Sequence, residues 1–311
     1  MISAENCFSR RIIQRIKMDT RRHELIKQHI DSFPVLPVTV MRLMTVTSNP
    51  ASSAQEVIDV ILTDQSLCLT VLKISNSVLF GRPHRVDSIK TAVSILGFDE
   101  VQRIALAKAL INSFSKVARQ HKASIDKFWE HSFVCGMVAR IMAKDLNISP
   151  DIAFMGGLIH DIGKLIMLET FAYDYALDWM LGLSTEQFHR DELHTFSFTH
   201  DRVGGHLLRK WLFPANLIAA VEAHHFPDKA TAEKDVASVI QLADFLSFYC
   251  CNQTSIGKDD FLLAMHNSLP DIQSTWQSCG LDWDVDAVYR WFDWLVNNYD
   301  QGCTLKEAFS S

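Results

Sequence analysis

The sequence lacks the features that are typical of membrane-spanning, secreted or nucleic-acid-binding proteins. No apolar run approaches the roughly 18 to 20 residues that a membrane span requires. The first residues carry arginines through a polar segment, where a signal peptide has an apolar stretch. The net charge is -6 at pH 7, whereas nucleic-acid-binding domains usually have a basic face. We therefore expect a cytoplasmic protein with no membrane segment and no nucleic-acid partner.

Disulfide and phosphate-loop signatures are absent as well. The chain has 7 cysteines, an odd number, and no Cys-x-x-Cys pair, which favours a reducing compartment over a disulfide framework. We expect Cys68 and Cys135 to be small buried apolar residues. No glycine-rich phosphate-binding loop occurs, so nothing in the sequence supports a kinase or a nucleotide switch.

Glycine and proline are sparse, with 12 and 8 residues, and apolar residues recur at helical intervals throughout the chain. Serine and acidic residues mark helix starts, as in the capping box Ser53-x-x-Glu56 and the predicted caps Ser88, Asp99 and Ser124. No segment has a convincing strand pattern. Because 311 residues are many for one compact core, the sequence predicts an all-α fold, a multi-helix bundle of two packed helical subdomains.

We expect the chain to divide into four parts. They are a basic amphipathic helix over residues 1–32, a helical subdomain over 33–118, a second one over 119–250 with the candidate metal site, and C-terminal helices over 251–311. The charged face of such a basic helix is usually exposed to solvent, and the alternative is that the helix docks to a partner. Trp283, Trp291 and Trp294 fit core packing best, with a homodimer or partner surface as the alternative.

The histidines are concentrated in one stretch of the chain. Of 13 histidines, eight lie between residues 131 and 225. Adjacent His160 and Asp161 can ligate one ion together, and imidazole with carboxylate suits Fe, Mn, Ni or Zn. A single histidine is more often a hydrogen-bonded structural residue than a ligand, so the prediction rests on the set. The candidate ligands are His131, His160, Asp161, His200, His224, His225 and Asp244.

Asp244 stands out because its helix is apolar nearly all round. A helix of that kind is normally buried, and a buried carboxylate without a partner costs several kcal/mol. We expect a metal ion to be the partner, and the alternative is an arginine or lysine at the edge of the core.

The order His131, His160-Asp161, Asp244 resembles the HD superfamily of metal-dependent phosphohydrolases. More narrowly, the chain resembles an HDOD-domain protein over residues 33 to 250. The matching segments are Phe33-Pro-Val-Leu-Pro, Leu72-Lys-Ile-Ser-Asn-Ser-Val-Leu-Phe-Gly, Ile89-Lys-Thr-Ala-Val-Ser-Ile-Leu-Gly, Phe128-Trp-Glu-His-Ser, Gly157-Leu-Ile-His-Asp-Ile-Gly-Lys, His200-Asp-Arg-Val-Gly-Gly, Trp211-Leu-Phe-Pro, His224-His-Phe-Pro and Ala243-Asp-Phe-Leu.

The resemblance implies a bacterial signal-transduction setting and one or two divalent ions. His131, His160, Asp161 and Asp244 would hold one ion, and His200, His224 and His225 a second. Asp161 would bridge the ions, and Lys164 would neutralise charge on a phosphomonoester, phosphodiester or nucleotide substrate; the alternative is a surface lysine. The segment Phe226-Pro-Asp-Lys replaces the Gly-Tyr-Pro of cyclic-di-GMP phosphodiesterase relatives, so that substrate is not implied.

HDOD proteins also act as regulatory or scaffolding modules. The alternative hypothesis is therefore a non-catalytic protein that binds a signalling partner, in which the metal is structural or absent. The sequence alone does not separate the two, because it does not show whether a bound ion keeps an open coordination position.

Overall fold

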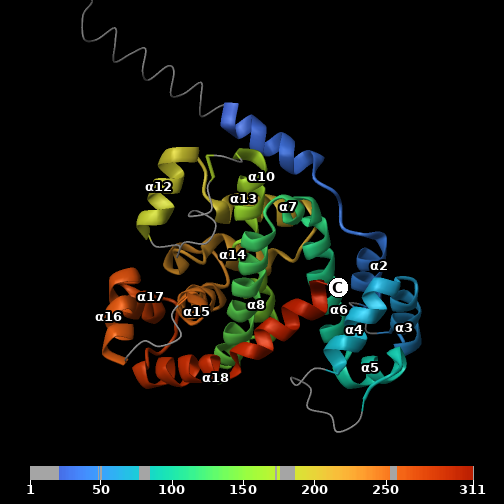
Figure 1. The fold of residues 1–311 in the computed structure, drawn as a ribbon. Helices are drawn as coiled ribbons and strands as arrows, with labels where there is room; N and C mark the ends of the chain where they lie inside the picture. Colours follow the sequence, from blue (N-terminus) through green and yellow to red (C-terminus); the bar gives the residue numbers. More distant parts are fainter. Residues whose placement is uncertain are drawn as a thin grey trace, which may run out of the picture. The chain divides into compact units, whose positions relative to one another are not determined.

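The computed structural model describes residues 21–47, 49, 51–76, 85–171, 174–175, 186–252 and 258–310 (Figure 1). Most of these residues belong to helices, and none of them belongs to a strand. The predicted all-α fold is therefore confirmed. Within the described part of the chain, no helix combines the length and the apolar character needed to cross a membrane.

The chain divides into two compact units, each built from segments that are far apart in the sequence. Unit 1 comprises Met1–Phe33, Ile159–Phe245 and Ile256–Trp283, and unit 2 comprises Pro34–Leu158, Leu246–Ser255 and Asp284–Ser311. The predicted four-part division along the chain stays a prediction.

Unit 2 holds the helices of the first half of the chain together with the C-terminal helix. Helix α2 packs on α3 and α6, and the long α8 packs along α18, where Trp291 Nε1 donates a hydrogen bond of 2.7 Å to Asp145 Oδ2. The helices are α2 (Val38–Thr47), α3 (Ala54–Leu62), α4 (Gln65–Ser75), α5 (Ile89–Leu96), α6 (Phe98–Ser113), α7 (Ser115–Gln120), α8 (Lys122–Asp145), α9 (Pro150–Ile159, to Leu158 in this unit) and α18 (Val285–Ser310).

Two of the four predicted helix caps are confirmed and two are wrong. Ser53 forms the capping box with Glu56, and Ser88 caps α5. Helix α6 instead begins after Gly97, whose φ of 80° favours glycine, and Asp99 lies in the first turn, where its charge suits the helix dipole. Ser124 is already inside α8, because its backbone amide donates to the His121 carbonyl at 3.1 Å.

Unit 1 contains most of the candidate ligands. Helix α13 packs against both α10 and α14, and α17 packs against η2. After a helix over residues 21–32, its elements are α10 (Ile162–Phe171), α12 (Glu186–Phe196), α13 (His200–Lys210), α14 (Ala215–Ala223), the 3-10 turn η2 (Pro227–Lys229), α15 (Lys234–Asn252, to Phe245 in this unit), α16 (Lys258–Ser268) and α17 (Ile272–Ser278).

The helix over residues 21–32 is fastened to unit 1 at its C-terminal end. Ile26 and Ile30 are buried, and the ammonium of Lys210 donates to the carbonyls of Ile30, Asp31 and Phe33 at 2.6 to 2.7 Å. A lysine at this position donates to carbonyls at the C-terminal end of the helix, which lack the amide partners of the helix interior. Most of the predicted basic face falls on residues 1–20, outside the described residues.

Helices α10 and α13 meet backbone to backbone. A Cβ atom added to Gly163 would lie 1.8 Å from the His200 carbonyl oxygen and 2.7 Å from the Gly204 amide nitrogen. Only glycine allows so close an approach. The pairing of Gly163 and Gly204 therefore brings the start of α13, and with it His200, next to the start of α10.

Candidate metal centre

The doublet His160-Asp161 lies between two helices. Helix α9 ends at Ile159 and α10 begins at Ile162, so neither helix contains the doublet. The amide of Lys164 donates to the Asp161 carbonyl at 2.8 Å, a bond across three residues that tightens the turn. Both side chains of the doublet are buried at this turn.

Asp161 uses its two carboxylate oxygens toward two different groups of residues. Oδ1 lies 3.0 Å from His200 Nε2 and 4.0 Å from His224 Nε2. Oδ2 lies 2.7 Å from the ammonium of Lys164 and 3.3 Å from His160 Nε2. The side chain of Asp161 is 2% exposed. A buried carboxylate is thus placed between two sets of nitrogen donors.

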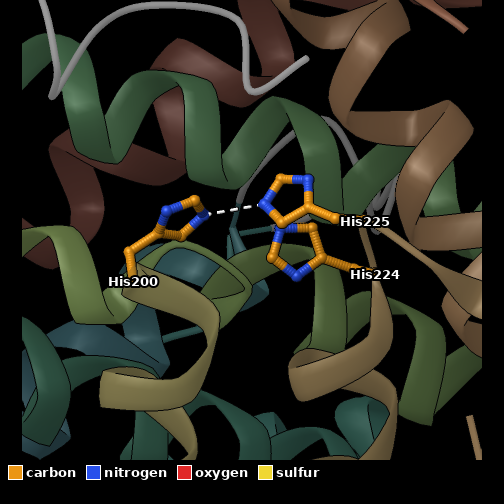
Figure 2. Close-up of side chains that lie close together, drawn as sticks. All are labelled: His200, His224 and His225. Carbon is orange, nitrogen blue, oxygen red and sulfur yellow. Dashed lines mark hydrogen bonds between the residues drawn. The ribbon is translucent and has the colours of Figure 1, made fainter. Parts of the chain in front are cut away.

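Three histidines form the first set, shown in Figure 2. His200 is the first residue of α13, while His224 caps the C-terminal end of α14 and His225 follows it. The Nε2 atoms of His200 and His225 are 2.9 Å apart, and the candidate ligand atoms of all three residues lie within 4.8 Å of one another. This spacing lets three imidazoles face one ion.

The hydrogen bonds of His200 and His224 favour tautomers that suit metal ligation. His200 Nδ1 lies 2.8 Å from Glu192 Oε2, and His224 Nδ1 lies 2.6 Å from the Val221 carbonyl oxygen. Since these oxygens accept, each Nδ1 carries a proton. The Nε2 atom of neutral His224 therefore presents a lone pair, and that of His200 presents one when a metal ion displaces its second proton. The Nε2 atom of His224 is buried and has no hydrogen-bond partner among the described residues.

The second set combines His160, Asp161 and Asp244, whose candidate ligand atoms also lie within 4.8 Å of one another. Asp244 lies on α15 and is 6% exposed, so its predicted burial is confirmed, and its Oδ1 is 3.5 Å from His160 Nε2. His131 belongs to α8 in unit 2, where its Nδ1 is 3.2 Å from the Ser247 hydroxyl. The predicted role of His131 as a ligand stays a prediction.

The electrostatics of unit 1 favour a cation at this place. Burial alone would raise the pKa of Asp161, but His160, Lys164 and His200 hold that pKa well below its usual value. Burial lowers the pKa of His200, yet the carboxylates of Glu192 and Asp161 outweigh burial and raise this pKa to about 9. The negative charge of these two carboxylates, which holds a second proton on His200, would also attract a metal ion in place of that proton.

His224 and His225 are neutral in this environment. Burial, followed by the neighbouring His160 and His200, lowers the pKa of His224 to about 3. Burial and the adjacent histidines also hold the pKa of His225 well below its usual value. Neutral imidazole is the form that binds metals, so both side chains are ready to act as ligands.

Lys164 is buried rather than exposed. Its side chain is 2% exposed, so the alternative of a surface lysine is wrong. Besides the contact with Asp161, its ammonium lies 5.2 Å from the centre of the Phe188 ring. The aromatic face and the carboxylate together fix a positive charge beside the candidate ligands.

Sequence reasoning missed Glu192, the residue that holds His200. Glu192 is fully buried on α12 and accepts hydrogen bonds from the His200 ring, the His200 amide and the Tyr175 hydroxyl. Its surroundings in the sequence, Glu-Gln-Phe-His-Arg-Asp-Glu-Leu-His, read as an exposed polar helix. No local signal separates this buried acid from its exposed neighbours.

Asp201 was also missed, although a signal for it exists. The pair His200-Asp201 repeats the doublet of residues 160 and 161. Asp201 is buried and lies 3.3 Å from His189 Nε2. The ring of His189 in turn lies 5.3 Å from that of His225 and 5.0 Å from that of Phe226, so a second His-Asp contact borders the three-histidine set.

Fold and site together define an all-α protein whose unit 1 gathers histidines and carboxylates in a buried cluster. The HDOD domain family matches residues 33–227, more than half of the chain. The chain therefore belongs to the HDOD family, and the predicted family is confirmed.

Two solved structures share the fold. A candidate phosphohydrolase from Shewanella amazonensis SB2B is 20% identical, with a TM-score of 0.69 over 92% of this chain and 98% of that one. A candidate signal transduction protein from Marinobacter aquaeolei VT8 is also 20% identical, with a TM-score of 0.69 over 94% of this chain and 66% of that one. At this identity the likeness establishes the fold alone.

Ribonuclease Y of Mycoplasma mycoides is similar to part of the chain. It is 24% identical over 152 residues, which are 47% of this chain and 29% of that protein. The match spans less than half the length of the curated relatives.

Proposed function

We propose that unit 1 holds one or two divalent transition-metal ions and hydrolyses a phosphoester in a bacterial signalling pathway. The observation that carries the proposal is the position of Asp161. One oxygen of its carboxylate faces His200 and the other faces His160 and Lys164, as a carboxylate shared by two ions would. Fe, Mn, Ni and Zn all suit imidazole and carboxylate ligands.

The residues present fit such an ion. Burying several charged and polar groups together is costly unless a partner compensates them. The buried Nε2 atom of His224 lacks a hydrogen-bond partner among the described residues, and two carboxylates raise the pKa of His200 to about 9. We assign one ion to His200, His224, His225 and Asp161, and the other to His160, Asp161 and Asp244; the sequence adds His131 as a predicted ligand.

A divalent ion in such a site supplies a water of lowered pKa and positive charge for phosphoryl oxygens. The protein's own contribution is orientation of the ligands and a buried, charged environment. Glu192 and the Val221 carbonyl fix the imidazoles of His200 and His224. Lys164 places an ammonium beside Asp161, where it can stabilise negative charge on a phosphoryl group.

The proposal is tested by a hydrolysis screen of phosphomonoesters and phosphodiesters with protein reloaded separately with Fe, Mn, Ni or Zn. Asp161→Asn keeps the shape of the side chain but removes its charge, so we expect hydrolysis to fall by about 100-fold or more. Asp191→Asn, at an exposed carboxylate on α12, is the matched control and keeps full activity. Equal rates for wild type and Asp161→Asn would contradict the proposal.

The alternative is a regulatory module in which the ion only joins helices. It predicts that wild-type protein retains metal through purification and hydrolyses no member of the screen, while Asp161→Asn loses metal and thermal stability together. A signalling partner, a homodimer and a cytoplasmic location stay predictions in either case.

A further inference from the structure

Unit 1 contains a cavity of about 440 Å³ beside the candidate ligands. His224, His225 and Asp244 line one side of it, and the other walls come from η2, α15, the end of α16 and α17. Its volume is in the range of sites that bury a small molecule. If the phosphoryl group of a phosphoester bound at the candidate metal centre, the rest of the substrate, which is the leaving group of hydrolysis, could occupy this cavity.

The walls away from the histidines carry more negative than positive charge. Asp228 and Asp271 are exposed carboxylates on the lining. Lys229 is the one ammonium among the described lining residues, and its Nζ lies 4.1 Å from the centre of the Phe226 ring. The ammonium of Lys229 thus already has a cation–π partner in Phe226. A second or third phosphate placed here would meet carboxylates.

The same walls offer apolar faces and hydroxyl groups. Phe226, Phe245 and Ile272 line the cavity together with Ser274, Thr275 and Ser278. Aromatic rings pack against flat apolar rings. The hydroxyls of Ser274 and Ser278 donate to the carbonyls of Asp271 and Thr275, so each can accept a hydrogen bond from a hydroxyl group of a ligand. This mixture suits a ring that carries hydroxyl groups better than it suits an alkyl chain or an anion.

We infer that the cavity binds the uncharged, hydroxyl-bearing ring of a phosphomonoester, a nucleoside being the representative case, and disfavours polyphosphates. The inference rests on the proposed function for the orientation of the substrate, because the phosphoryl group is taken to lie at the candidate ligands. The negative charge of the ligand then lies beside the candidate metal ligands. Asp228 and Asp271, on the walls away from the histidines, disfavour a ligand with additional phosphates.

The first test measures binding, which needs no turnover. The probes are adenosine, guanosine, cytidine and uridine, titrated calorimetrically into the full chain as purified and again after removal of metal with a chelator. We expect at least one nucleoside to bind in both states. Ser274→Trp fills the cavity and should weaken that binding by about tenfold or more, whereas Gln273→Trp, at an exposed position of the same helix outside the lining, should not. Absence of nucleoside binding, or equal weakening by both variants, would overturn the inference.

The second test concerns charge. For the nucleoside that binds, its monophosphate should bind the wild type more tightly than its triphosphate. The double variant Asp228→Asn/Asp271→Asn should reduce the ratio of the two dissociation constants by about fivefold. The control Asp282→Asn removes an exposed carboxylate of unit 1 outside the lining and should leave the difference unchanged. A triphosphate that binds wild type as tightly as the monophosphate would contradict the charge argument.

The two tests separate failure of the inference from failure of the proposed function. Nucleoside binding to metal-free protein depends only on the cavity. If nucleosides bind and Ser274→Trp abolishes binding, but the protein holds no metal and hydrolyses nothing, the cavity assignment stands and the hydrolase proposal fails. If metal binds and phosphoesters are hydrolysed while no nucleoside binds, the proposed function stands and the cavity assignment fails.

Discussion

Glu192 Oε2 lies 2.8 Å from His200 Nδ1 and equally close to the His200 backbone amide. One buried carboxylate thus fixes both the ring and the backbone of the first residue of α13. The other oxygen of Glu192 accepts from the Tyr175 hydroxyl at 2.8 Å, and burial together with Glu192 raises the pKa of that hydroxyl well above its usual value. This contact sets which nitrogen of His200 faces Asp161.

Glu192→Gln should weaken metal binding without abolishing the fold. Glutamine keeps the size of the side chain but loses the charge that stabilises the Nδ1 proton of His200. Carboxylates that orient a metal-binding histidine typically contribute about 10- to 100-fold to metal affinity, and we expect a loss in that range in competition with a fluorescent chelator. Asp191→Asn, on the same helix but exposed, should bind metal as wild type does. Unchanged affinity in Glu192→Gln would show that the contact does not serve the metal.

Lys164→Met should destabilise the metal-free protein more than the metal-loaded protein. Without metal, Asp161 depends on the Lys164 ammonium at 2.7 Å, and breaking a buried ion pair by removing one partner costs about 3 to 5 kcal/mol. Bound ions would supply the missing positive charge. Urea unfolding with and without metal measures the difference.

Lys144→Met is the control for that comparison, because Lys144 is exposed near the end of α8 and should change stability little in either state. If metal does not reduce the loss caused by Lys164→Met, the account of Asp161 as a shared carboxylate is wrong.

Gly163→Ala should separate α10 from α13. The added Cβ would lie 1.8 Å from the His200 carbonyl oxygen, so one of the two backbones must move and displace His200 from Asp161. We expect a lower melting temperature together with loss of bound metal. Ile162→Val, at the buried neighbouring position, should cost only about 0.5 to 1.5 kcal/mol and keep its metal. Retention of wild-type metal affinity in Gly163→Ala would contradict the role of this backbone contact.

Ser53→Ala tests unit 2 separately from the candidate centre. The Ser53 side chain accepts from the Glu56 amide in the capping box of α3, and loss of such a cap costs about 1 kcal/mol. Urea unfolding should show this loss with metal content unchanged. Ser52→Ala, one residue earlier and outside the capping box, is the matched variant and should have a smaller effect.

The helices were predictable because their signals are local. Ser53 with Glu56, and Ser88 before α5, mark starts that depend only on neighbouring residues. The prediction for Ser124 was wrong because the start of α8 is not set by residue type alone. Serine is a favourable cap, but α8 follows α7 after His121 and begins at Lys122, two residues before Ser124. Residue type alone does not reveal where the preceding helix directs the chain.

The candidate site was predictable in its residue types but not in its surroundings. The doublet of residues 160 and 161 and the isolated acid Asp244 stand out in the sequence, and the structure buries all three. Glu192 does not stand out, because its burial depends on how α12 packs against the start of α13. The close approach of Gly163 to the His200 carbonyl joins residues far apart in the sequence, so no local pattern records it.

The most direct measurement is the metal content per chain of protein purified without added metal or chelator, determined by plasma mass spectrometry for wild type and for His200→Ala/His225→Ala. The account predicts about one or two equivalents of Fe, Mn, Ni or Zn in wild type and at least one equivalent fewer in the variant, with both proteins folded by circular dichroism. Folded wild-type protein that holds no metal, even after reloading with each of these ions, would contradict it.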